Sequence, residues 1–359
     1  MIEPSPAGDG PLFPFVPMPF RTFALLFLLA ASSLAQATPL GLVLPTDNDA
    51  IFSDDPSKFY MYTDRNFEGV RTKPWQGGTY GFSRNQKRTS FGIVYTRLHE
   101  GIDIRPVRRD SSGTPLDEVR SIMNGTVVYV NSNSRASNYG RYVVVHHDFG
   151  SGPFFSLYAH LASELVQQGQ QVRAGQAIAK MGYTGAGINR ERAHVHVELN
   201  MLLSDQFQRW YDRHFTSPNH HGIYNGFNLT GLDIAALLKA HRANPSITIE
   251  QFLGSTEVYY KVLVPGSRKL DFARRYPFLT RDADKVAFPK SWEFSFAATG
   301  VPLAVSPSTR KLSFPIVTYV KPSQTDHSYH TVGRITGTGS SAQLTPSGSR
   351  YVQLLSDSF

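Results

Sequence analysis

The sequence predicts a mainly β protein built on antiparallel sheets, with a few added helices. From Lys73 to Leu203 short apolar runs recur between glycines; they include GTVVYV, RYVVVHH, FFSLYAHL and HVHVELN. Such runs are typical of strands, and glycines such as Gly140 and Gly175 lie where tight turns would follow them. The 359 residues are 41% hydrophobic and 12% aromatic, so the chain can bury a large core in one or two domains.

The N-terminus predicts export. The stretch RTFALLFLLAASSLAQA contains basic Arg21, an apolar run and small residues at Ala35 and Ala37, so residues 1–37 are predicted to be a signal peptide cut near Ala37. The apolar run is short for a membrane span and no second one follows. We therefore expect a periplasmic or secreted protein without a stable membrane span, and the residues leave open whether translation begins at Met1 or Met18.

The remaining chain is divided by composition and periodicity. Residues 38–72 are interpreted as an N-terminal extension, 73–215 as the first β domain, 216–254 as a helical connector and 255–359 as a second, β-rich module. Helical spacing is found at 204–215 and at 229–243, the latter ending just before Pro245. Residues 331–355 are rich in Gly, Ser and Thr and are predicted to be loops.

Charge and cysteine content limit the chemistry. A formal charge of +8 favours an anionic partner, which could be nucleic acid, a membrane surface or an acidic polymer. The chain has no cysteine, which excludes disulfides, thiolate zinc sites and a lipid-modified cysteine. Any metal must therefore be held by nitrogen and oxygen.

The stretch HVHVELN carries the strongest chemical signal. In a strand, His194, His196 and Glu198 share one face, opposite the valines and leucine. Upstream, RLHEGIDI supplies His99 and Asp103, and three such ligands leave a fourth zinc position to water, as catalytic zinc sites do. Taken alone, HxH would more simply be the solvated face of a half-buried strand, and His99 with Asp103 a surface pair.

Three motifs in order, HEGID, YAHL and HVHVE, resemble the lysostaphin-type or LytM-type zinc endopeptidases of peptidase family M23, which cut peptidoglycan. The resemblance covers roughly residues 75–203 and includes connecting strands and turns such as YGRYVVVHHD. It implies a lysostaphin-type (duplicated hybrid motif) catalytic domain, Zn²⁺ as cofactor, and peptidoglycan as partner, not nucleic acid. It further implies His99, Asp103 and His196 as metal ligands and His160 and His194 as catalytic residues.

This division of roles suits amide hydrolysis. Bound zinc lowers the pKa of its water to about 7 and polarises a carbonyl. The leaving nitrogen also needs a proton and the oxyanion needs stabilisation, tasks that two metal-free histidines could share. The residues do not say which histidine takes which task.

The sequence departs from the family before the HxH motif. The connector AGINRERA is longer and more charged than expected, and residues 190–192 are predicted to rim the cleft and affect substrate preference. Glu198 could orient a metal ligand or form a plain strand salt bridge.

Other polar and aromatic residues are interpreted as structural. His146 and His147 are expected to have structural roles, and His220 with His221 to form a turn. Tyr142 is expected in the core, although it could reach the cleft.

Three other functions share part of this pattern. A cupin-type metalloenzyme also uses HxH but does not explain HEGID, and a biotinyl or lipoyl carrier needs a lysine at a hairpin tip, whereas Lys180 is followed by MGYTG. The alternative retained is a non-catalytic wall-binding or hydrolase-activating module of the same fold, which would be expected to lack one or more ligands. The bond cut, Gly-Gly or a D-amino-acid cross-link, the role of 255–359 and the oligomeric state stay open.

Overall fold

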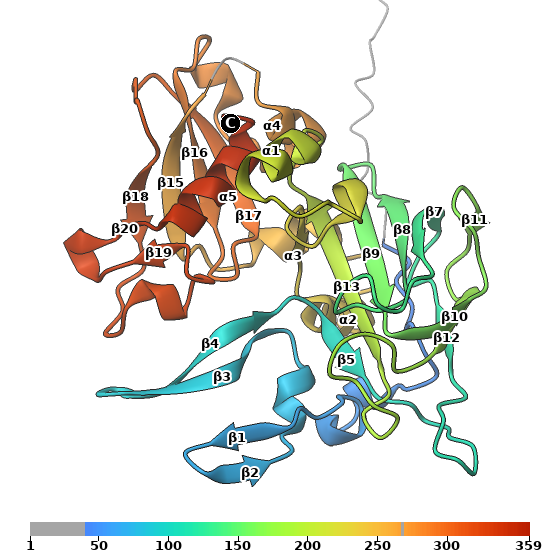
Figure 1. Ribbon diagram of the computed structural model, residues 1–359. Helices are drawn as coiled ribbons and strands as arrows, with labels where there is room; N and C mark the ends of the chain where they lie inside the picture. Colours follow the sequence, from blue (N-terminus) through green and yellow to red (C-terminus); the bar gives the residue numbers. More distant parts are fainter. Residues whose placement is uncertain (1–39, 267–268) are drawn as a thin grey trace, which may run out of the picture. The chain divides into compact units, whose positions relative to one another are not determined.

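The computed structural model describes residues 40–266 and 269–359, which belong to one compact unit, Ala37–Phe359 (Figure 1). The predicted signal peptide, its cleavage site and Met18 lie outside the described residues. Within those two ranges, no helix is both long and apolar enough to cross a membrane.

The largest sheet confirms the prediction of a mainly β, antiparallel fold. Its strands run in the order β11-β7-β8-β9-β13-β14, and β5 pairs with β13 beside this path. Their bounds are β5 (Ile102–Ile104), β7 (Gly125–Asn131), β8 (Tyr142–Asp148), β9 (Pro153–Ala159), β11 (Gln171–Val172), β13 (Val195–Leu202) and β14 (Leu229–Gly231). β9 covers one edge of β13, while β5 and β14 pair with its beginning and its end.

Smaller sheets and hairpins surround this sheet. A three-stranded sheet has the order β10-β12-β6, and two hairpins, β1-β2 and β3-β4, precede β5 in the chain (Figure 1). The bounds are β1 (Arg65–Phe67), β2 (Val70–Thr72), β3 (Gly81–Thr89), β4 (Gly92–His99), β6 (Glu118–Arg120), β10 (Leu161–Glu164) and β12 (Ala177–Met181). The end of β4 lies next to β5, which brings this hairpin to the edge of β13.

Strand β13 is buried on both faces along its whole length. Val195, Val197 and the apolar residues that alternate after them enter the large hydrophobic core, as the period of two requires. The opposite face carries His196 and Glu198, which are only 5% and 1% exposed. The alternative of a solvated strand face is therefore wrong, since these polar groups are buried and must be satisfied inside the protein.

The C-terminal part of the chain contains a second antiparallel sheet, in the order β17-β16-β15-β18. Its strands are β15 (Tyr260–Pro265), β16 (Ser291–Phe296), β17 (Pro302–Ser308) and β18 (Ile316–Val320), and a short pair, β19 (Ile335–Thr336) and β20 (Gln343–Leu344), follows. Tyr276 ties this part to the main sheet, because its hydroxyl donates to the carbonyl of Pro153 and accepts from the N–H of Leu202, both at 2.8 Å.

The helices differ in part from the sequence prediction. They are α1 (Phe207–His214), α2 (Ile234–Ala243), α3 (Ile249–Gly254), α4 (Asp271–Arg275) and α5 (Pro346–Ser356). The helix expected over 229–243 begins only at Ile234, because Leu229–Gly231 pairs with β13 and Asp233 caps the helix. The prediction of loops throughout 331–355 was wrong for α5, which starts at the cap Thr345 with Pro at its first position.

Candidate metal centre and active-site cleft

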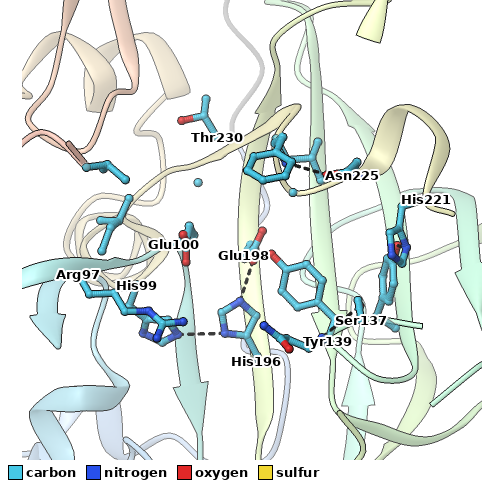
Figure 2. Close-up of a pocket in the computed structure, with 18 of the residues that line it drawn as sticks. Arg97, His99, Glu100, Ser137, Tyr139, His196, Glu198, His221, Asn225 and Thr230 are labelled. Atoms are coloured by element: carbon cyan, nitrogen blue, oxygen red, sulfur yellow. Dashed lines mark hydrogen bonds and ion pairs between the residues drawn. The ribbon is translucent and has the colours of Figure 1, made fainter. Parts of the chain in front are cut away.

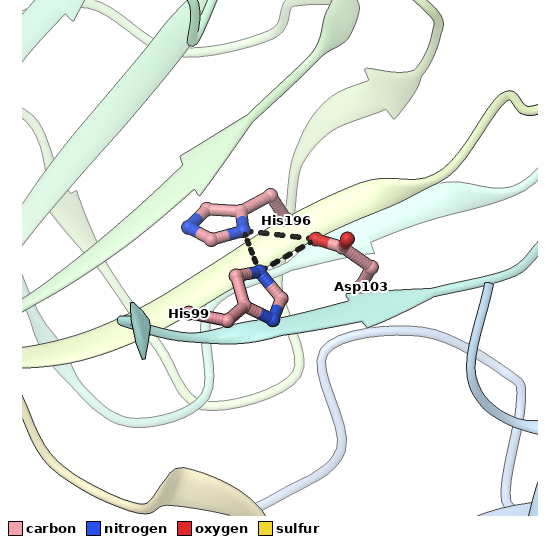
Figure 3. A group of neighbouring side chains, drawn as sticks. All are labelled: His99, Asp103 and His196. Carbon is pink, nitrogen blue, oxygen red and sulfur yellow. Dashed lines mark hydrogen bonds and ion pairs between the residues drawn. The ribbon is translucent and has the colours of Figure 1, made fainter. Parts of the chain in front are cut away.

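Three side chains from distant parts of the sequence meet beside β13. His99 ends β4, and Asp103 in β5 lies opposite His196 in the strand register. Oδ1 of Asp103 lies 3.1 Å from Nε2 of His99 and 2.9 Å from Nδ1 of His196, and the two nitrogens are 3.0 Å apart (Figure 3). In the described part of the chain they are the group of three whose ligand atoms all lie within 4.8 Å of one another.

Gly101 allows this meeting. A Cβ atom at Gly101 would lie 2.3 Å from the carbonyl oxygen of Val197, too close for any side chain. The glycine in the HEGID motif therefore lets the turn between His99 and Asp103 lie directly against β13.

The outer hydrogen bonds of the two imidazoles fix which nitrogen faces the centre. Nδ1 of His99 lies 2.9 Å from the carbonyl oxygen of Thr79, which can only accept, so Nδ1 carries the proton. Nε2 of His196 lies 2.7 Å from Oε1 of Glu198 and is the donor there. Nε2 of His99 and Nδ1 of His196 thus both face the carboxylate, and each has a lone pair for a metal ion once His196 has lost its proton.

Asp103 supplies the negative charge of the centre. Its Oδ2 accepts from Arg84 at 2.6 Å, which leaves Oδ1 facing the histidines. Burial alone would raise the pKa of Asp103, but the surrounding histidines, His99 foremost, hold it well below its usual range. Asp103 is therefore ionised although it is buried, as a metal ligand must be.

The two histidines respond to this environment in opposite ways. Burial lowers the pKa of His99, whereas for His196 the hydrogen bonds to Asp103 and Glu198 outweigh burial and raise the pKa to about 10. The centre therefore attracts one positive charge, which a proton or a metal ion can supply. Two imidazole nitrogens and one carboxylate oxygen form a donor set that suits zinc.

His160 and His194 lie beside this group. Nδ1 of His160 lies 2.8 Å from the carbonyl of Thr184, and Nδ1 of His194 lies 2.6 Å from the carbonyl of Arg192, so both rings are oriented from behind. Their ring centroids are 4.8 Å apart, and Nε2 of His194 is 3.4 Å from Oδ1 of Asp103. The five residues singled out in the sequence thus converge at one place.

The backbone of His160 is strained. Its φ is +62°, a left-handed conformation that is uncommon for residues other than glycine and that concentrates at functional sites. Burial, together with the neighbouring His194 and His196, lowers the pKa of His160 well below its usual value. The ring is therefore neutral at neutral pH and can accept a proton.

The structure adds side chains that the sequence interpretation missed. Tyr139 donates to Oε1 of Glu198 at 2.6 Å, and the amide of Asn200 donates to Oε2 at 2.8 Å. Asn200 could have been found, because it shares the face of His196 and Glu198 by alternation. Arg84 could not, since nothing in the sequence joins β3 to Asp103.

Two of the other histidines, His147 and His221, have different surroundings. His147 is buried and uses both ring nitrogens, on the carbonyl of Asn124 and the hydroxyl of Ser156, at 2.8 and 2.7 Å. His221 lies in the cleft wall and shares a 2.7 Å hydrogen bond with Tyr142, so these two residues do reach the cleft.

A cavity of about 810 Å³ opens over the centre. All five residues line it, together with Tyr139, Glu198 and residues 186–188. Figure 2 labels His99, His196, Tyr139 and Glu198 in its wall. Its walls also include residues from the C-terminal part of the chain, among them Val332, Arg334 and Arg350. The cavity is large enough to take several residues of a peptide.

One segment of the chain is similar to known proteins. Residues 97–207 match the family model described as Peptidase family M23. Over 102 residues the chain is 37% identical to the lipoprotein NlpD/LppB homolog of Pseudomonas aeruginosa, covering 28% of this chain and 29% of that protein. Over 92 residues it is 34% identical to the murein hydrolase activator NlpD of Salmonella typhimurium, covering 26% and 21%. Each match spans less than a third of the curated relative.

Among solved structures, the catalytic domain of the antimicrobial peptidase lysostaphin from Staphylococcus simulans is 25% identical. That match covers 34% of this chain and 75% of the lysostaphin domain, with a TM-score of 0.24.

Proposed function

We propose that this chain, whose residues 97–207 match the model of peptidase family M23, is an exported zinc metalloendopeptidase that hydrolyses amide bonds in peptidoglycan peptide stems or cross-bridges. The observation that carries the proposal is the convergence of lone pairs from His99, Asp103 and His196, with two further histidines beside them. Zinc is the metal proposed, because the donor set is two nitrogens and one oxygen without sulfur.

When bound, zinc would supply an activated water and polarise the scissile carbonyl. The chain's own residues supply the rest. His160 and His194 keep Nε2 available, since Nδ1 of each donates to a backbone carbonyl. In its neutral form one can take a proton at Nε2 and later pass it to the leaving nitrogen, while the other, when protonated at Nε2 as well, can donate to the carbonyl oxygen. Glu198 and the Thr79 carbonyl hold the ligand rings in place.

The proposed location is the periplasm or the outside of the cell. The curated relatives include envelope proteins named as lipoproteins, and the predicted signal peptide agrees with export. The net charge of +8 suits an anionic wall polymer, and we propose peptidoglycan, not nucleic acid, as the partner.

The second candidate is a non-catalytic module that activates other wall hydrolases, because one similar protein is named a murein hydrolase activator. The occupied ligand positions favour an enzyme, because His99, Asp103 and His196 each offer a ligand atom to the proposed metal.

Metal dependence separates the two candidates. The purified protein would be stripped with a chelator, reloaded with one equivalent of zinc, and incubated with isolated peptidoglycan while new amino groups are counted. An enzyme releases amines only when reloaded. An activator releases none in either state, although it can still bind the wall.

A further inference from the structure

The C-terminal module forms part of the cleft wall, and its position is fixed by hydrogen bonds. Tyr80, near the start of β3, donates its hydroxyl to Gly231 at 2.8 Å and lies 3.1 Å from the hydroxyl of Thr299. On the other side, Nε1 of Trp210 in α1 donates to the carbonyl of Arg350 at 3.0 Å. The module therefore holds side chains at the cavity through contacts with both β3 and α1.

Arg334 is held in this wall on several sides. One of its guanidinium nitrogens donates to the carbonyl of Thr299 at 2.9 Å, and its Cζ lies 3.7 Å from the ring centre of buried Tyr351. A Cβ on Gly300, which has φ +95°, would collide with the guanidinium at 1.5 Å. Such a fixed guanidinium loses little entropy when it binds a ligand.

The loop that carries Arg334 is also strained. Val332, a β-branched residue in the same cavity wall, has φ +56°. The hydroxyl of Thr331 holds the turn by donating to the carbonyl of His327 and accepting from the N–H of Ile335, at 2.8 and 3.0 Å. Strain of this kind persists only where surrounding contacts over-determine it, often next to a bound ligand.

The cavity has more positive than negative side chains. Five arginines and three carboxylates line it; they are Arg84, Arg97, Arg192, Arg334 and Arg350 with Glu100, Asp103 and Glu198. Two of the carboxylates are already engaged, Asp103 by Arg84 and the histidines and Glu198 by His196, Tyr139 and Asn200.

Arg97 and Arg350 have spare capacity for an anion. Arg97 is exposed and lies directly across the hairpin from Arg84, an arrangement of like charges that an anion would relieve. In Figure 2 it lies on the same side of the cavity as His99 and Glu100. Among the described residues, neither the Arg97 nor the Arg350 guanidinium has a hydrogen-bond or ion-pair partner.

We infer that Arg97, Arg334 and Arg350 form a subsite for a carboxylate of the peptide substrate, so that the C-terminal module determines specificity for acidic wall peptides over neutral ones. The inference rests on the proposed function and narrows its substrate class. A glycine bridge has no side-chain carboxylate to offer the three guanidinium groups. A stem peptide with a free carboxylate would pair with them through charge-assisted hydrogen bonds.

The test compares two ligands that differ in this group alone. One is a cross-linked wall-peptide dimer with D-glutamate in its stems, and the other is the same dimer with D-isoglutamine. We expect the zinc-loaded wild type to prefer the acidic dimer roughly tenfold in kcat/KM, as one charge-assisted contact would provide. The double variant Arg97→Gln/Arg350→Gln should lose this preference, so that its kcat/KM values on the two dimers become equal.

Arg173→Gln is the matched control, because Arg173 is exposed in a turn and does not line the cavity. It removes the same charge and should keep the preference, which separates a subsite from the general effect of net charge. Equal rates of the wild type on both dimers, or a preference that survives in the double variant, would overturn the inference.

Binding of the two dimers, followed by fluorescence anisotropy, distinguishes the subsite from the proposed activity. If neither dimer is cut but the acidic one binds about tenfold more tightly through the two arginines, the subsite stands and the proposed activity fails. If both are cut and bound equally, the activity stands and the subsite fails. Absence of binding to either dimer contradicts the subsite.

Discussion

Nε2 of His196 donates to Oε1 of Glu198 across 2.7 Å, within a strand that is buried on both faces. Glu198 in turn accepts from Tyr139 and Asn200, so its carboxylate is held by three donors. This relationship points Nδ1 of His196 at Asp103 and His99, where it can hold either a proton or a metal ion. The hydrogen bond to Glu198 therefore orients the His196 ring so that its other nitrogen can bind a metal ion.

Replacing the Glu198 carboxylate should weaken metal binding without removing a metal ligand. We expect Glu198→Gln to lower zinc affinity by roughly tenfold, and Glu198→Ala by up to about a hundredfold, since groups that orient a ligand histidine typically contribute this much. Competition with a chromophoric chelator measures the affinity. Glu118→Gln, on β6 and outside the cavity, is the control, and unchanged affinity in both Glu198 variants would refute the orienting role.

Zinc should stabilise the folded protein through His99. A ligand at about a hundred times its Kd adds about 2.7 kcal/mol to the free energy of unfolding, so zinc should raise the thermal midpoint of the wild type. His99→Ala removes one donor and should abolish this rise. His160→Ala should retain it, and a rise lost in His160→Ala would show that His160 belongs to the metal site instead.

Acid should destabilise the protein through His147. Burial lowers the pKa of His147 from 6.5 to about 4, so the folded state prefers the neutral ring. Between these two values the unfolded chain binds the proton and the folded protein does not. The contribution of neutral His147 to the free energy of unfolding is therefore complete above pH 6.5, and it falls by about 3 kcal/mol as the pH drops to about 4.

Urea unfolding at several pH values between 7 and 4 tests this. His147→Gln should show a shallower loss of stability over that interval, because the titrating group is gone. His220→Gln, in an exposed loop, should keep the wild-type slope. Identical slopes in all three proteins would contradict the assignment.

The Tyr276 hydroxyl should stabilise the contact between the C-terminal module and the main sheet. Tyr276→Phe leaves the carbonyl of Pro153 and the N–H of Leu202 without this partner, which should cost about 1–3 kcal/mol in the free energy of unfolding. Tyr319→Phe, at a 43% exposed position of β18, is the control and should change little. Equal stabilities of the two variants would argue against the contact.

The sequence was most informative where a strand's two-residue alternation or a single short motif determines the local structure. The alternation of two predicted that His196 and Glu198 share a face, and the glycines predicted the antiparallel strands. It failed where residues from separate parts of the chain meet. Arg84 contacts Asp103 only because β3 pairs with β4. Helix α5 follows a Gly- and Ser-rich stretch, and it is stabilised by the burial of Tyr351, Leu354 and Leu355. Such tertiary contacts override local propensity.

The central claim is that His160 acts in zinc-dependent catalysis without binding the metal, and one measurement tests it most directly. Wild type and His160→Ala, both carrying one equivalent of zinc, would be incubated with the same isolated peptidoglycan, and the new amino groups would be counted. We predict that the wild type releases amines and that His160→Ala, with zinc still bound, releases them at least about a hundredfold more slowly. Equal release by the two proteins, or none by the zinc-loaded wild type, would contradict the account.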